Sequence, residues 1–144
     1  MLRQLLAGGI ACILCIAIHA AIMAVVVRVA NVVTARPWER APLLLVTTMI
    51  ATVSVLMVAH VLEVVVWALV YGIVGAAPAG SDMVYFAFVN YTTLGYGDVV
   101  PAERWRLLGP ATAMCGVLMF GWSTAVIFEV LRQAMRRGDQ KGEP

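Results

Sequence analysis

Residues 92–98 read Thr-Thr-Leu-Gly-Tyr-Gly-Asp, and this run has the clearest chemical potential in the chain. Backbone carbonyl oxygens can replace the water shell of a bare cation when several rings of them follow one another. Gly95 and Gly97 make such a backbone possible, because glycine adopts positive φ and has no side chain to block neighbouring copies. Thr93 adds a hydroxyl oxygen at one end. The run therefore predicts a site that binds dehydrated cations through its backbone.

The segments around this run are those of a membrane protein. Hydrophobic residues make up 62% of the 144 positions and charged residues 12%. Three apolar segments, at 5–27, 43–71 and 107–131, reach the roughly 20 residues that a bilayer crossing needs. A fourth, at 83–91, is too short to cross and fits a re-entrant helix, whose backbone ends must be covered by protein or water. The formal charge of +2 does not suggest nucleic-acid binding, and the expected partner is the lipid bilayer.

The sequence Thr-Leu-Gly-Tyr-Gly at 93–97 resembles the selectivity-filter signature of potassium channels, which has the form Thr-x-Gly-Tyr-Gly. The resemblance is specific over residues 81–98, weaker over the flanking apolar segments and absent for the first segment. It is closest to small prokaryotic-type channels, with one extra N-terminal span. It implies an all-α membrane protein with three transmembrane helices, a re-entrant pore helix and an extended selectivity filter. One chain supplies one filter strand, so the resemblance also implies a homotetramer.

The resemblance assigns roles to individual residues. Passive potassium conduction would use the Thr93 hydroxyl and four backbone carbonyls, those of Thr93, Leu94, Gly95 and Tyr96. Gly97 would permit the final turn, Asp98 would anchor the outer end, and Thr92 would support the ion sites. Tyr85 is placed to donate its hydroxyl to Asp98.

Breaks in composition divide the chain into four parts. These are an extra N-terminal transmembrane helix at 1–35, a cytoplasmic elbow at 36–42, a pore module at 43–133 and a cytoplasmic tail at 134–144. Within the pore module we expect an outer helix at 43–74, a pore helix at 82–91, the filter at 92–98 and an inner helix at 107–133. Ser81 is expected to be the N-cap of the pore helix, with Asp82 in its first turn.

Basic residues predict the orientation of the chain. Seven lie in the first connection or the tail, at positions 28, 36, 40, 132, 136, 137 and 141, and three lie elsewhere, at 3, 104 and 106. The positive-inside rule then places the elbow and the tail in the cytoplasm. The N-terminus and the filter would face outward. The chain is therefore predicted to be a multi-pass protein of the cell membrane.

His60 and Glu63 lie at membrane depth in the second span, where ionisable groups are costly and normally face protein or a cavity. Glu63 lies three residues after His60 on the same helical face, a spacing that permits contact. Together with Trp67 they would form a polar seam behind the pore helix or the filter. Two interpretations stay open for His60 and Glu63, a satisfied structural pair and a proton sensor.

Cys12, Cys15 and His19 share one face of the first segment, at spacings of three and four. Thiolate and imidazole are ligands that zinc prefers, so these residues form a weak candidate for a metal site. The alternative is that they pack between helices as small or hydrogen-bonding side chains. Beyond this candidate and the permeant potassium ion, no metal or cofactor is expected.

The last segment contains the candidates for gating. Gly116 and Gly121 would either allow the inner helix to bend or let helices pack closely. Glu129 would either form a ring of carboxylates at the inner mouth or pair with Arg132 or Gln133, one turn further on. No segment has the regularly spaced arginines of a voltage sensor. Constitutive opening, pH, membrane tension and a regulatory partner all stay open.

Two other functions compete with selective conduction. One is a non-selective cation channel, and the other is a non-conducting regulatory or scaffold subunit that docks a partner through the extra span. An enzyme is not expected, because the sequence contains no nucleophile and base pair, phosphate loop or strong metal-ligand set.

Overall fold

The computed structural model describes residues 1–34 and 41–139. Its elements, in chain order, are α1 (Leu2–Thr34), α2 (Ala41–Val74), α3 (Met83–Tyr91), the 3₁₀ turn η2 (Glu103–Trp105) and α4 (Leu108–Asp139). No β-strand occurs in these ranges. Three helices are long and apolar enough to cross a membrane. The predicted all-helical membrane class is therefore confirmed.

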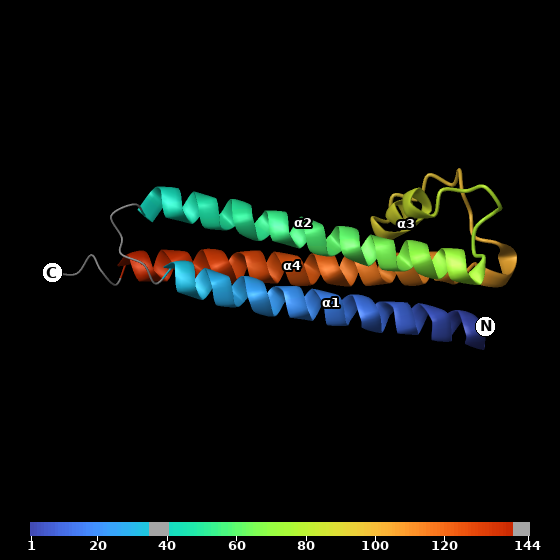
Figure 1. The fold of residues 1–144 in the computed structure, drawn as a ribbon, viewed down its shortest axis with the longest axis horizontal. Coiled ribbons are helices and arrows are strands. Elements are labelled where there is room, and N and C mark those ends of the chain that lie inside the picture. The colour runs from blue at the N-terminus through green and yellow to red at the C-terminus, as the bar shows by residue number, and fades with distance from the viewer. Residues whose placement is uncertain (35–40, 140–144) are drawn as a thin grey trace.

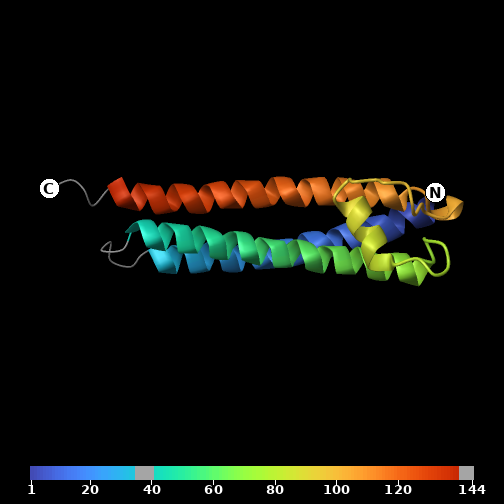
Figure 2. The ribbon, with the colours of Figure 1, turned by 90° about the horizontal axis from the view of Figure 1, so that it is seen from above.

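The three long helices run side by side, and the short helix α3 packs against one end of the bundle (Figure 1). Seen from above, α3 crosses between α2 and α4 (Figure 2). The helix α1 contacts the other faces of α2 and α4. The N-terminus lies at the end that carries α3, and the described part of α4 ends at the opposite end.

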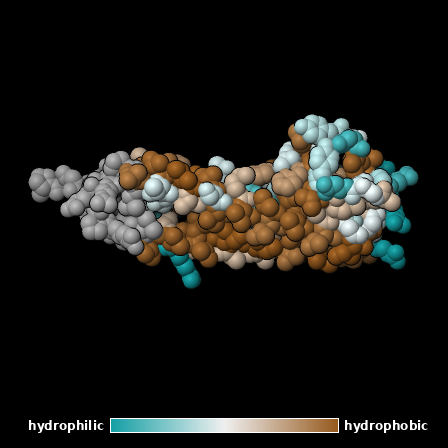
Figure 3. All heavy atoms as spheres, turned by 45° about the horizontal axis from the view of Figure 1, so that its top comes forward, coloured by the Kyte–Doolittle hydropathy of each residue, from teal (hydrophilic) through white to brown (hydrophobic). Residues whose placement is uncertain are grey.

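Long apolar side chains cover most of the outside of the bundle. Leu5, Ile13, Val53 and Leu69 are among the large hydrophobic residues that the structure leaves exposed. On the face shown in Figure 3, hydrophobic residues extend along the bundle and hydrophilic ones gather at the end with α3. A helix that is apolar on all sides is typical of a membrane span, because lipid tails take the place of a protein core.

Aromatic packing fixes α3 on the bundle. Tyr71 of α2 lies against Phe86 of α3, with ring centroids 4.7 Å apart, and both side chains are buried. Tyr91, at the end of α3, meets Phe120 of α4 edge to face at 5.5 Å. Such ring pairs stabilise a contact by roughly 0.5–1.5 kcal/mol beyond the burial of their area. The residues that follow Tyr91 are therefore held at a defined place.

The N-cap of α3 is Asp82, so the expectation that Ser81 caps this helix is wrong. One carboxylate oxygen of Asp82 accepts from the backbone N–H of Val84 at 2.9 Å and of Tyr85 at 3.1 Å. Because Asp82 has the extended backbone of a cap, α3 begins at Met83, one residue later than predicted.

Several helices begin or end at other residues than predicted. The last helix ends at Asp139 rather than at residue 133, since the added residues include the good helix formers Ala, Met and Arg. The second begins at Ala41, and the first extends to both sides of the predicted span, 5–27. Most of the predicted elbow at 36–42 and the last residues of the predicted tail, 140–144, lie outside the described residues.

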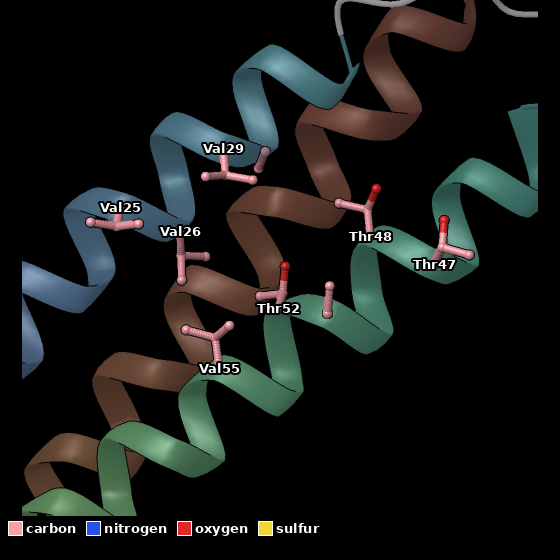
Figure 4. Close-up of a pocket in the computed structure, with 9 residues that line it drawn as sticks. Val25, Val26, Val29, Thr47, Thr48, Thr52 and Val55 are labelled. Carbon is pink, nitrogen blue, oxygen red and sulfur yellow. The ribbon is translucent and has the colours of Figure 1, made fainter.

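An apolar pocket of about 220 Å³ lies between α1 and α2, toward the end of the bundle opposite α3. Figure 4 shows Val26 of α1 and Thr52 and Val55 of α2 at the space between the two helices. This pocket is therefore not part of the loop that follows α3.

Candidate functional site

The loop at 92–98 begins by folding back on the C-terminal turn of α3. The Thr92 N–H and hydroxyl both donate to the carbonyl of Phe88, at 2.9 and 2.7 Å. The N–H of Thr93 donates to Asn90 O at 3.0 Å, and that of Leu94 donates to Val89 O at 2.9 Å. These bonds satisfy carbonyls that the end of a helix leaves without partners. The start of the loop is thereby tied to α3.

Positive φ recurs at every second residue along the loop. The values are 60° at Thr93, 59° at Gly95 and 79° at Gly97. Glycine adopts this region without steric cost, as expected for positions 95 and 97. Thr93 is β-branched, and positive φ is a genuine outlier for such a residue. Nothing in the residue types around Thr93 predicts this conformation, which strains the backbone at the predicted inner end of the ion sites.

Four consecutive backbone oxygens of this loop accept no hydrogen bond from the described part of the chain. No hydrogen bond within residues 1–34 and 41–139 uses the carbonyls of Thr93, Leu94, Gly95 or Tyr96. Leu94 is 53% exposed and Tyr96 67% exposed. The Thr93 hydroxyl donates to the carbonyl of Thr92 at 2.6 Å, which leaves the oxygen of that hydroxyl able to accept or coordinate. The loop therefore presents five oxygens with free lone pairs.

Asp98 is held at the far end of the loop. The hydroxyl of Tyr85, in the first turn of α3, donates to one carboxylate oxygen at 2.6 Å. The N–H of Val99 donates to the other at 3.0 Å. The Tyr85 hydroxyl holds the pKa of Asp98 below its ordinary value of 3.8, and the same hydrogen bond raises the pKa of Tyr85. The predicted contact between Tyr85 and Asp98 is present.

The Tyr85→Phe variant is expected to raise the pKa of Asp98 toward its ordinary value, because the variant removes the strongest group that favours the carboxylate. In the unaltered protein the lowered pKa keeps Asp98 ionised, and its contacts intact, until the pH falls through that pKa. In the variant the pKa of Asp98 is higher, so Asp98 becomes protonated and loses its interactions at a higher pH. The carboxyl carbon shift of Asp98, followed by NMR during acid titration, measures this. Tyr96→Phe is the matched control and should leave the titration unchanged, since Tyr96 does not hydrogen-bond to Asp98.

Behind the loop, a buried polar cluster joins all four α-helices. Glu63 of α2 is completely buried, and one of its carboxylate oxygens lies 2.7 Å from His19 Nδ1 of α1. The other lies 3.3 Å from His60 Nδ1 and accepts a short hydrogen bond from the hydroxyl of Tyr91, at the end of α3. Ser123 of α4 completes the cluster, its Oγ 3.0 Å from His60 Nε2 and 3.3 Å from His19 Nε2.

The cluster contains both members of the predicted pair, His60 and Glu63, but its remaining members were not predicted. His19 and Tyr91 come from other helices, and residues 19 and 63 are far apart in sequence. Trp67 is buried against Tyr71 and, among the described residues, makes no hydrogen bond to His60 or Glu63. The polar seam therefore runs across the bundle rather than along α2 to Trp67. Because Tyr91 precedes the loop directly, the cluster lies immediately behind Thr92.

The three candidate metal ligands of the first helix do not converge on one point. The Cys12 thiol lies 4.0 Å from the carbonyl of Ala111, and the Cys15 thiol lies 3.9 Å from the backbone oxygen of Glu63. His19 instead points at the carboxylate of Glu63. Both cysteines are free and pack with the core around α3, so packing is the role that the structure supports for them.

A family model described as "Ion channel" matches residues 59–133, just over half of the chain. The chain belongs to this ion channel family. The matched residues run from the second half of α2 through α3 and the loop to most of α4. In this chain, therefore, the family resemblance covers the loop and the residues that hold it, and α1 lies outside it.

A protein of Rhodopseudomonas palustris named "Putative potassium channel protein" is 34% identical to this chain over 59 residues. That similarity covers 40% of the present chain and 14% of the relative, so the chain spans a small part of that relative's length. No solved structure matches the chain.

The two candidate gating glycines of this channel's last helix have different surroundings. A Cβ atom at Gly116 would lie 2.0 Å from the carbonyl oxygen of Tyr91. A Cβ atom at Gly121 would meet nothing within 4 Å in the single chain. Gly116 therefore allows the end of α3 to approach α4, which is the packing role considered for it. Gly121 has no such contact.

Glu129 pairs along its own helix. Its carboxylate lies 2.6 Å from Arg132 Nη2 and accepts from the side-chain amide of Gln133 at 2.8 Å. Both partners lie about one turn further on, as the second of the two interpretations of Glu129 proposed. With these partners Glu129 is partly neutralised at the end of the bundle opposite the loop.

Proposed function

We propose that this ion channel conducts potassium selectively and passively through the loop at 92–98. The observation that carries the proposal is the backbone of this loop, with positive φ at positions 93, 95 and 97 and four consecutive carbonyls that no hydrogen bond of the described chain uses. Carbonyls left free in this way are able to replace the hydration shell of potassium. The name of the Rhodopseudomonas palustris relative supports the same ion.

Four copies of the chain surround the ion pathway in this proposal. One chain contributes one strand of carbonyls, and closed rings of oxygen need several strands. The exposure of Leu94 and Tyr96 in the single chain supports this arrangement, because neighbouring copies would cover them. A homotetramer with cyclic symmetry is the form that fits one strand per chain.

Each residue of the loop has its own role in the proposal. The carbonyls and the hydroxyl described above bind the ion, and Gly97 permits the last turn. Asp98, held by Tyr85, anchors the outer end, and Thr92 ties the inner end to α3. His60 and Glu63 support the loop from behind through Tyr91. No cofactor takes part, and the protein is not an enzyme.

The proposal places the loop and the N-terminus outside the cell membrane and the end of α4 in the cytoplasm. The position of the N-terminus at the same end of the bundle as α3 supports this orientation (Figure 1). Opening does not use a voltage sensor, since none of the three described spans carries a row of arginines.

Ion flux through liposomes that contain the purified protein tests the proposal. We expect potassium flux far above sodium flux in the unaltered protein. Gly95→Ala should reduce potassium flux at least about tenfold, because alanine at positive φ costs about 1–2 kcal/mol per chain and disturbs the ion sites. Gly72→Ala is the control, since Gly72 lies within α2 and a Cβ there meets nothing within 4 Å.

Equal flux of sodium and potassium would contradict selectivity and would indicate a non-selective cation channel. A stable tetramer without flux across a range of pH and membrane tension would indicate a regulatory or scaffold subunit. Full flux in Gly95→Ala would show that ions do not use this loop.

A further inference from the structure

We propose that His19, His60 and Glu63 form a binding site for a divalent transition-metal cation such as Zn²⁺ or Co²⁺. The chain has two histidines, and both meet at the same buried carboxylate although they come from different helices. Each of the three residues offers one ligand atom, and these atoms all lie within 4.8 Å of one another. Two imidazoles and one carboxylate are a set of ligands that Zn²⁺ accepts, with a fourth position open.

Two contacts in the cluster, one to each oxygen of Glu63, are close to the ligand separations of a tetrahedral site. His19 Nδ1 and His60 Nδ1 lie 2.7 and 3.3 Å from the two oxygens of Glu63. Ligand atoms about 2.0–2.1 Å from a tetrahedral ion lie roughly 3.3 Å from one another. The side chains therefore need only small rotations to surround one ion, which would take the place of the protons between them.

Ser123 provides the second reason. When Nδ1 of a histidine binds a metal, its proton is on Nε2, and this N–H usually donates to a group that orients the ring. Both Nε2 atoms face Ser123 Oγ, at 3.0 and 3.3 Å, and a hydroxyl oxygen has two lone pairs to accept them. If both Nδ1 atoms carried the protons instead, both Nε2 atoms would be acceptors. The Ser123 hydroxyl has one proton and could donate to only one of them. The metal-bound arrangement thus satisfies both contacts of Ser123.

Charge is the third reason. Within the described chain the buried carboxylate of Glu63 faces the two histidines, and no lysine or arginine there pairs with it. The Tyr91 hydroxyl bonds to Glu63 and lies 3.0 Å from His60 Nδ1, next to the open fourth position. A phenolate there would balance the site, with two positive charges from the ion and one negative charge each from Glu63 and Tyr91. The phenol proton would leave to solvent on binding.

A bound ion would brace α1 and α2 against the end of α3. Tyr91 directly precedes the loop at 92–98, so the ion would stiffen the support of that loop. This effect on the loop rests on the proposed function, whereas the metal site itself does not. The His60 side chain is 11% exposed, and it gives the ion a route into the cluster.

Titration of the full chain with Co²⁺ in detergent, without a histidine tag, tests the proposal. We expect one Co²⁺ per chain with the visible absorption of a four-coordinate ion, displaced by Zn²⁺. His19→Gln and His60→Gln should each lower the affinity by more than about 100-fold, and Ser123→Ala by about 10- to 100-fold. This readout does not depend on ion flux, so it separates failure of the metal site from failure of the proposed conduction.

A variant with Cys12, Cys15 and Cys115 all replaced by serine is the matched control, and it should keep both the stoichiometry and the spectrum. Helix content and elution volume show which variants are folded, and Ser123→Ala keeps the test decisive if a histidine variant misfolds. The proposal is overturned if the unaltered protein does not bind Co²⁺, if folded histidine or Ser123 variants bind it unchanged, or if the cysteine variant loses it.

Discussion

Replacing Gly116 by alanine is expected to abolish potassium flux and to prevent stable packing of α3 on α4. The added Cβ would lie 2.0 Å from the carbonyl oxygen of Tyr91 and 3.3 Å from its ring. The obstacle is backbone, which cannot turn aside as a flexible side chain would. The cost should therefore exceed the roughly 1–3 kcal/mol that is typical of overpacking. Thermal unfolding in detergent and liposome flux measure the two effects.

Gly121→Ala is the matched control for this prediction, because its Cβ would meet nothing within 4 Å in the single chain. We expect the variant to unfold at or above the temperature of the unaltered protein, since alanine is favoured over glycine within a helix. A normal unfolding temperature and normal flux in Gly116→Ala would show that α3 does not lie this close to α4. Equal loss of flux in both variants would instead favour bending of the helix at glycine.

Replacing Glu63 by alanine is expected to destabilise the folded protein by about 3–5 kcal/mol, the range for removing one partner of a buried charged pair. The variant leaves His19, His60 and Tyr91 without their shared acceptor in the middle of the bundle. Equilibrium unfolding of the purified protein in detergent measures the free energy. Since these partners come from three different helices, the loss should appear as one cooperative shift.

Glu129→Ala is the comparison, because it also removes a glutamate that has side-chain partners, Arg132 and Gln133, but at the surface. Glu129 is 36% exposed and its partner Arg132 is 45% exposed, so the pair should contribute at most about 1 kcal/mol. Similar losses from the two variants would mean that water screens the cluster around Glu63. The carboxylate of Glu63 would then be in contact with water rather than enclosed between the helices.

Much of this fold is predictable because its signals are local. Long apolar runs predict three spans, and a short apolar run before two glycines predicts α3 and the loop after it. The glycines at 95 and 97 predict positive φ where it occurs. For these features the chemistry of a few neighbouring residues is sufficient. The contact of Tyr85 with Asp98 is different, because the family resemblance implied it and the structure shows it.

The remaining features depend on contacts between distant segments. His19 follows two cysteines by one and two turns on its own helix, so the sequence suggests that it groups with them. In the structure it contacts Glu63 of α2 instead. Only the packing of α1 on α2 brings it to Glu63. The close approach behind Gly116 likewise depends on where α3 meets α4. Thr93 has positive φ because the bonds of its neighbours to α3 impose it, against its own preference.

The place of His19 in the buried cluster has a consequence for the modularity of this channel. The part of the chain that matches the family begins at residue 59, so α1 looks like an addition that could be removed. Yet a chain cut after residue 35 would turn the carboxylate of Glu63 toward lipid hydrocarbon, where ionisable groups are costly. The remaining spans would then have to neutralise or hide that acid before they could insert. In this protein the first helix therefore completes the enclosure of the acid behind the loop.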